Sequence, residues 1–149
     1  MLLLKKEYVD LMIKHAINDD PNECCGILAG NGNEVSLVYK IRNTTPSPYR
    51  YVMDPQEMLN AMQDADQKGL DFIAFYHSHT HSPAYPSDTD TRMAVESGWV
   101  DFRYGLVSLE DKTNPCVKEI SLQSQSNPSL ARPKRGFCPQ SHKTPLVAS

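Results

Sequence analysis

The run from Leu70 to Tyr76 constrains this chain most, because it is nearly continuous in apolar residues and ends directly at His77-Ser78-His79. A short apolar run of this kind is typical of a central strand that is covered on both faces. Residues two apart on a strand share a face, so both imidazoles should point to the same side of the sheet. The sequence therefore predicts a buried strand that delivers two histidines at its end.

A polar, proline-containing loop follows the histidines, and Ser87 then has the character of a helix cap, with Asp90 at the third helical position. A carboxylate in the first turn of a helix is favoured by the helix dipole. Two imidazole nitrogens and one carboxylate oxygen form the ligand set of a catalytic zinc, which keeps a fourth position open for water. His77, His79 and Asp90 are therefore the candidate ligands of one Zn²⁺ per chain.

A zinc hydrolase also needs a general base and a donor for the developing oxyanion. Glu23 directly precedes the apolar run 24–29 and is the candidate that takes a proton from water and later gives one to the leaving nitrogen. Ser87 is the candidate oxyanion donor if its hydroxyl faces the site. Taken singly, each feature has an ordinary interpretation: a surface histidine pair, a capping box and a solvated acid.

The remaining elements follow from periodicity and turn residues. Helical spacing of apolar residues covers 8–17, and alternating or continuous apolar runs predict strands over 25–29, 35–41, 102–109 and 116–122. Asp54-Pro55-Gln56-Glu57 is a strong helix start, and the helix should bury Met58, Leu59, Met62 and Ala65. This order of elements predicts an α/β fold, with a mixed sheet flanked by helices in a single domain over 1–122. Residues 123–149 are polar and aperiodic and are expected to be a disordered tail.

Charge and composition exclude several classes of protein. The chain has 149 residues and a net charge of −3, and residues 123–149 carry four bases and no acid, which leaves −7 on residues 1–122. An acidic body argues against nucleic acid as the partner. No apolar stretch approaches the roughly 18 residues that span a bilayer, so no membrane association is expected. The four cysteines contain no CxxC pair, which favours a reduced, cytoplasmic protein without a disulfide framework.

These residues together resemble a known motif. Glu23 within Asn22–Leu28, then His77-Ser78-His79, Ser87 and Asp90, resembles the JAMM (MPN-plus, Mov34/PAD-1) metalloprotease motif in type, order and spacing. The resemblance covers about residues 1–122 and implies a JAMM/MPN-type, cytidine deaminase-like fold. It also implies the same roles for the five residues: three zinc ligands, Glu23 as acid/base and Ser87 as oxyanion stabiliser.

The resemblance further implies a substrate. Thr80 after the second histidine, where proline is common in the family, is similar to small bacterial members. Those hydrolyse the bond between the Gly-Gly tail of a ubiquitin-like sulfur-carrier protein and a cysteine, which they release. The segments 46–51 and 80–85 are the expected walls of the groove for this tail. The oligomeric state is left open, a homodimer included.

Three alternatives stay open at this point. An isopeptidase would remove ubiquitin-like modifiers from protein lysines with the same site. A thiol hydrolase would use Cys24 or Cys25 with His77 instead of a metal. A non-catalytic MPN binding module would hold a structural zinc or none, although a fourth protein ligand is evident only if His81 serves as one.

Overall fold

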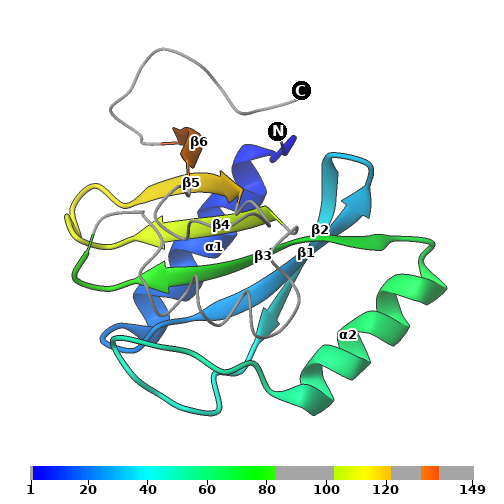
Figure 1. Cartoon of the computed structure of the whole chain (residues 1–149), viewed down its shortest axis with the longest axis horizontal. Helices are drawn as coiled ribbons and strands as arrows, with labels where there is room; N and C mark the ends of the chain where they lie inside the picture. The colour runs from blue at the N-terminus through cyan, green and yellow to red at the C-terminus, as the bar shows by residue number, and fades with distance from the viewer. Residues whose placement is uncertain (1, 83–102, 122–131, 138–149) are drawn as a thin grey trace.

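The computed structural model describes residues 2–82, 103–121 and 132–137 (Figure 1). These residues form two helices and six strands. In chain order the elements are α1 (Lys6–Asp19), β1 (Cys25–Asn31), β2 (Glu34–Ile41), α2 (Pro55–Gln67), β3 (Asp71–His79), β4 (Arg103–Ser108), β5 (Cys116–Ser121) and β6 (Arg132–Phe137).

All six strands belong to one mixed sheet with the order β2-β1-β3-β4-β5-β6. Four of the five neighbouring pairs are antiparallel, and β3 and β4 are parallel. β3 is therefore an interior strand, as its continuous apolar run predicts, and it ends at the same edge of the sheet as β4. The two predicted histidines lie at that edge.

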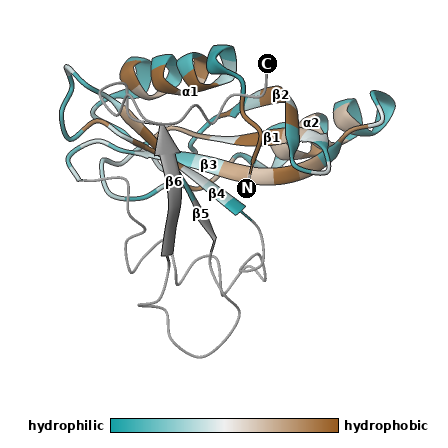
Figure 2. Cartoon of the chain, turned by 90° about the horizontal axis from the view of Figure 1, so that it is seen from above, coloured by the Kyte–Doolittle hydropathy of each residue, from teal (hydrophilic) through white to brown (hydrophobic). Residues whose placement is uncertain are grey.

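The two faces of the sheet carry separate cores. Val9, Met12 and Ala16 of α1 pack with Leu28 and Tyr76 on one face. On the other face Ala61 of α2 belongs to a cluster whose strand residues are Cys25, Ile27, Ile41, Phe75, Tyr104 and Leu106. Figure 2 shows α1 along one face of the sheet, with hydrophobic and hydrophilic residues alternating along the helix. The α/β fold with helices on the sheet is confirmed.

The second helix begins as its sequence predicts but packs differently. The Asp54 carboxylate accepts hydrogen bonds from the backbone N–H groups of Gln56 and Glu57, at 2.9 and 3.3 Å. The buried side chains of α2 are Ala61 and Ala65, whereas Leu59 and Met62 are 46% and 47% exposed. The predicted burial of those two larger side chains is wrong, because the helix approaches the sheet through its small residues.

The expectation of a disordered tail over 123–149 is wrong for residues 132–137. These residues form β6, which pairs antiparallel with β5 at the edge of the sheet. An edge strand can form from backbone hydrogen bonds alone and tolerates a proline such as Pro133. Residues 132–137 show no alternation of apolar and polar side chains, so the sequence pattern did not predict a strand there.

Two further expectations concern membranes and cysteines. Within the described residues no helix is both long and apolar enough to cross a membrane. Cys24 and Cys25 are free and buried. Cys116 at the start of β5 is disulfide-bonded, which goes against the expectation of a reduced protein without disulfides.

Gly26 of β1 yields a testable prediction about the α1 face. A Cβ atom at Gly26 would overlap the ring of Tyr76, the residue before His77. At Gly105 it would meet the mobile tip of Met12 at 3.2 Å and the Cβ of Tyr76 at 3.3 Å. We expect Gly26→Ala to lower the free energy of unfolding by about 3 kcal/mol, and Gly105→Ala by about 1 kcal/mol, in urea titrations. Equal midpoints for the two variants would contradict this packing.

Candidate metal centre

The register between β1 and β3 sets the start of β1 against the strand end that carries the two histidines. Cys25 pairs with His77. One residue further, the Ser78 N–H donates to the Cys24 carbonyl at 3.1 Å, and the Cys24 N–H donates to Ser78 Oγ at 2.8 Å. Glu23 precedes β1, and we expect the same register, continued by one residue, to set Glu23 beside His79. Because side chains alternate along a strand, His77 and His79 share the face of the sheet that carries α2.

The two imidazoles are buried and close together. His77 is 1% exposed and His79 is 3% exposed, and their ring centroids are 5.1 Å apart. Two imidazoles that bind one tetrahedral zinc at about 2.0–2.1 Å have ring centroids about 5 Å apart. The spacing of the rings therefore fits two ligands of a single ion.

An aromatic ring and a neighbouring strand enclose the histidines. Tyr51 stacks on His77 with ring centroids 4.6 Å apart and planes inclined by 28°. The His79 carbonyl accepts the backbone N–H of Leu109 at 2.8 Å, just past the end of β4. The site thus lies at the carboxyl end of a parallel strand pair, an edge of α/β sheets where ligands commonly bind.

Glu23 lies just before β1 and is 3% exposed. The segment that follows β2 holds its backbone: the Glu23 N–H donates to the Ser47 carbonyl at 2.8 Å, and Asn43 Nδ2 donates to the Glu23 carbonyl at 3.1 Å. Glu23 also lines a cavity of about 530 Å³, together with Asn22, Lys40 and Asn43. A buried carboxylate that lines a cavity has surroundings that suit a general base.

The other two predicted residues, Ser87 and Asp90, lie outside the described residues. Within the described part of the chain, no group of three or more His, Cys, Asp or Glu side chains is placed to hold a metal ion. The structure therefore brings His77 and His79 together, and the roles of Glu23, Ser87 and Asp90 stay predictions.

The cysteines next to Glu23 have the properties of core residues rather than nucleophiles. Cys24 and Cys25 are both fully buried. Burial raises the pKa of the Cys24 thiol to about 12 and also raises the pKa of Cys25 strongly. A thiol that stays protonated near neutral pH is a poor nucleophile, which weighs against the thiol hydrolase alternative.

The histidines outside the motif differ in their surroundings. His15 of α1 is buried, its Nδ1 lies 2.8 Å from Tyr76 Oη, and it lines the same cavity as Glu23. Burial lowers the pKa of His15, which favours a neutral, structural imidazole. His81 is exposed just beyond β3.

Sequence reasoning missed Asn43 and placed Tyr51 only within an expected groove wall. The Thr80 hydroxyl lies 3.4 Å from the Pro48 carbonyl, so the two expected wall segments, 46–51 and 80–85, meet at that point. An asparagine just after a strand favours a side-chain turn, which was the available signal for Asn43.

Comparison with known proteins identifies the class. Residues 5–120 match the family described as prokaryotic homologs of the JAB domain. The CysO-cysteine peptidase of Mycobacterium tuberculosis is 38% identical over 116 residues, which cover 74% of this chain and 75% of that protein. The desampylase of Pyrococcus furiosus is 37% identical over 89 residues, covering 60% of this chain and 63% of its own length.

A solved structure agrees with this assignment. The solution structure of a protein from Desulfitobacterium hafniense superposes with a TM-score of 0.77 at 31% identity, covering 90% of each chain. The mixed sheet with its histidine pair at one edge is that of a JAB-type domain. The chain belongs to the family of prokaryotic JAB-domain proteins, and the predicted family is confirmed.

Thiol labelling tests the interpretation of the two buried cysteines. We expect iodoacetamide to leave Cys24 and Cys25 unmodified in the folded protein, because both thiols are buried and their pKa values are raised. The same reagent should label both in denaturant, as peptide mass spectrometry would show. Labelling of either residue in the folded protein at the rate of an exposed thiol would restore the thiol hydrolase alternative.

Proposed function

We propose that this protein hydrolyses the amide bond after the C-terminal Gly-Gly of a ubiquitin-like sulfur-carrier protein and releases cysteine. The observation that carries the proposal is the buried pair His77 and His79, whose ring centroids lie 5.1 Å apart at the end of β3. The relative named CysO-cysteine peptidase, which aligns over three quarters of its length, supports the same chemistry.

Zinc is the proposed cofactor, one ion per chain. His77 and His79 fit two of its ligand positions by ring spacing and burial, and Asp90 is the proposed third ligand. A bound zinc supplies a Lewis acid that polarises the substrate carbonyl and acidifies water.

Each proposed site residue has a separate role in the hydrolysis. Glu23 accepts a proton from the attacking water as the water oxygen bonds to the carbonyl carbon. When the C–N bond breaks, Glu23 returns that proton to the leaving amine. Ser87 is the proposed donor to the oxyanion. Tyr51, stacked on His77, covers one side of the imidazole.

A Gly-Gly tail suits this architecture as a substrate. Glycine lacks a side chain, so an extended tail can lie in a narrow groove and pair its backbone with a strand edge. Residues 46–51 and 80–85 are the proposed walls. A homodimer and a cytoplasmic location are retained as proposals; Cys24 and Cys25 are free thiols, whereas Cys116 is disulfide-bonded.

An isopeptidase that removes ubiquitin-like modifiers from lysines is the second candidate. The relative named desampylase favours it, and it would use the same residues. The two functions differ only in the leaving amine, which is cysteine in one case and a lysine side chain in the other.

Metal removal and substitution test the proposed centre. We expect a chelator to abolish hydrolysis of a carrier–cysteine adduct, and added Zn²⁺ to restore it. Glu23→Gln should lower turnover at least about 100-fold while zinc content stays near one per chain, because Glu23 is the base and not a ligand. His77→Ala should lose the metal, as elemental analysis would show.

His81→Ala is the matched control, since His81 is exposed beside the same strand. It should keep both zinc and turnover. Normal turnover in Glu23→Gln would overturn the assignment of the base, and loss of zinc in His81→Ala would overturn the ligand set.

The choice between the two leaving amines needs two substrates in one assay. We expect the purified protein to cleave a carrier–cysteine adduct at least about tenfold faster, in kcat/KM, than the same carrier linked to a lysine side chain, a difference of about 1.4 kcal/mol. Mass spectrometry would follow both products. Faster cleavage of the lysine adduct would favour the isopeptidase instead.

A further inference from the structure

Asn43 lies two residues after the end of β2, and its side-chain amide makes four hydrogen bonds to the backbone. Its Nδ2 donates to the carbonyls of Glu23 and Arg50 at 3.1 and 3.3 Å. Its Oδ1 accepts the backbone N–H groups of Thr45 and Val52, both at 3.0 Å. Two donated and two accepted bonds use the full capacity of an amide, and Asn43 is 9% exposed.

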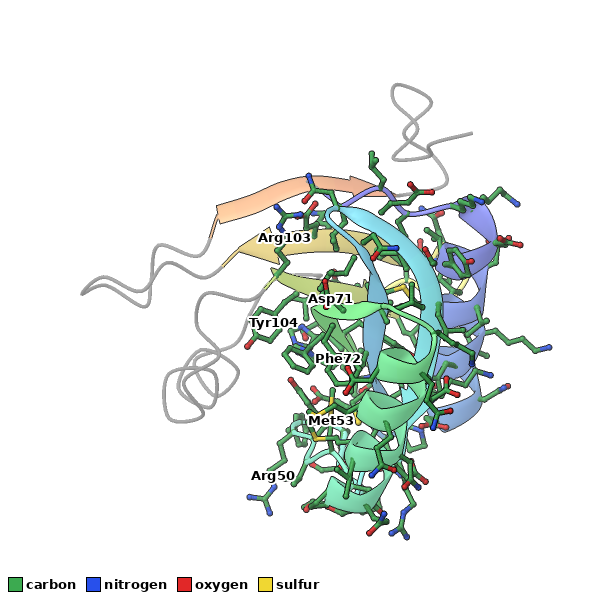
Figure 3. The ribbon with its side chains drawn as sticks, turned by 90° about the vertical axis from the view of Figure 1, so that its right-hand side faces the viewer. Arg50, Met53, Asp71, Phe72, Arg103 and Tyr104 are labelled. Atoms are coloured by element: carbon green, nitrogen blue, oxygen red, sulfur yellow. The ribbon has the colours of Figure 1, made fainter. Side chains whose placement is uncertain are left out.

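The two ends of this amide do different things. The oxygen binds only N–H groups of the segment 43–53, so it closes that loop on itself. The nitrogen connects the loop to the Glu23 carbonyl. In Figure 3 the Arg50 side chain points away from the protein, so Arg50 contributes its backbone carbonyl to this network and leaves its side chain in solvent.

The backbone of Glu23 depends on this loop because the β1 strand begins only at Cys25. Its N–H is bound by the Ser47 carbonyl at 2.8 Å and its carbonyl by Asn43. The same loop also carries Tyr51, whose ring lies on His77. One segment therefore contacts both the proposed base and a proposed metal ligand.

We propose that Asn43 is a positioning residue for catalysis, which holds the Glu23 carboxylate in register with the His77–His79 pair. This inference rests on the proposed function, in which Glu23 is the base. Misplacement of a reacting group by about 1 Å can cost about 100-fold in rate. A residue that fixes the backbone of the base thus affects turnover without touching substrate.

Asn43→Asp removes both donors of the amide and keeps its acceptor. Aspartate has nearly the same shape and keeps an oxygen for the N–H groups of Thr45 and Val52, but its carboxylate cannot donate to the carbonyls of Glu23 and Arg50. We expect kcat for the carrier–cysteine adduct to fall about 10- to 100-fold, with KM within about threefold and zinc content unchanged.

Thr44→Val is the matched control within the same loop. The Thr44 hydroxyl donates to the Val52 carbonyl at 3.1 Å, a contact that lies within the loop. Turnover should stay within about twofold of the original protein. If Asn43→Asp fails to fold by thermal melting, Asn43→Ser replaces it, since a serine hydroxyl can supply one donor, and its kcat should fall by a smaller factor.

A double-substitution cycle with Glu23→Asp supplies a readout that a purely structural role would not change. Glu23→Asp already withdraws the carboxylate by one methylene, so adding Asn43→Asp should cost at most about threefold more. An equal loss in both backgrounds, or normal kcat in Asn43→Asp while Glu23→Gln is inactive, would overturn the positioning role. Full turnover in Glu23→Gln would instead overturn the proposed function.

Discussion

The antiparallel register between β1 and β3 is the constraint on which the rest of this protein depends. It sets Cys25 opposite His77 and ties Cys24 to Ser78, and we propose that its continuation by one residue brings Glu23 alongside His79. A slip of one residue would turn every side chain of the strand to the opposite face and separate the carboxylate from the imidazoles. The bond from the Cys24 N–H to Ser78 Oγ ties the two strands together at the position next to the site.

The strands and the loop contribute differently to the site. The sheet provides the face and the spacing of the two imidazoles, since both lie on one rigid strand that is covered on both sides. The segment 43–53 provides what the sheet does not reach, namely the backbone partners of Glu23 and an aromatic cover over His77. Groups held on rigid elements and supported by further hydrogen bonds keep a productive geometry.

Much of this arrangement could be predicted from local sequence signals. The apolar run before His77 predicted β3, and the cap at Asp54 predicted the start of α2. Both signals are local, because the start of a strand or helix depends on neighbouring residues. The burial of Leu59 and Met62 was mispredicted, because which stripe of a helix meets the sheet depends on tertiary packing. β6 was not predicted, because an edge strand can form through backbone hydrogen bonds to its neighbour, which leave no pattern in its side chains. The network of Asn43 joins residues 20 apart in sequence, and no local pattern encodes such a contact.

The central claim is that the paired strands present two imidazoles to one metal ion on the face shared with Glu23. Anomalous X-ray diffraction at the zinc absorption edge, from crystals grown with Zn²⁺, measures this directly. The account predicts one strong peak about 2 Å from a ring nitrogen of both His77 and His79. A zinc-loaded crystal with its peak elsewhere, or with the two rings turned away from a common ion, would contradict it.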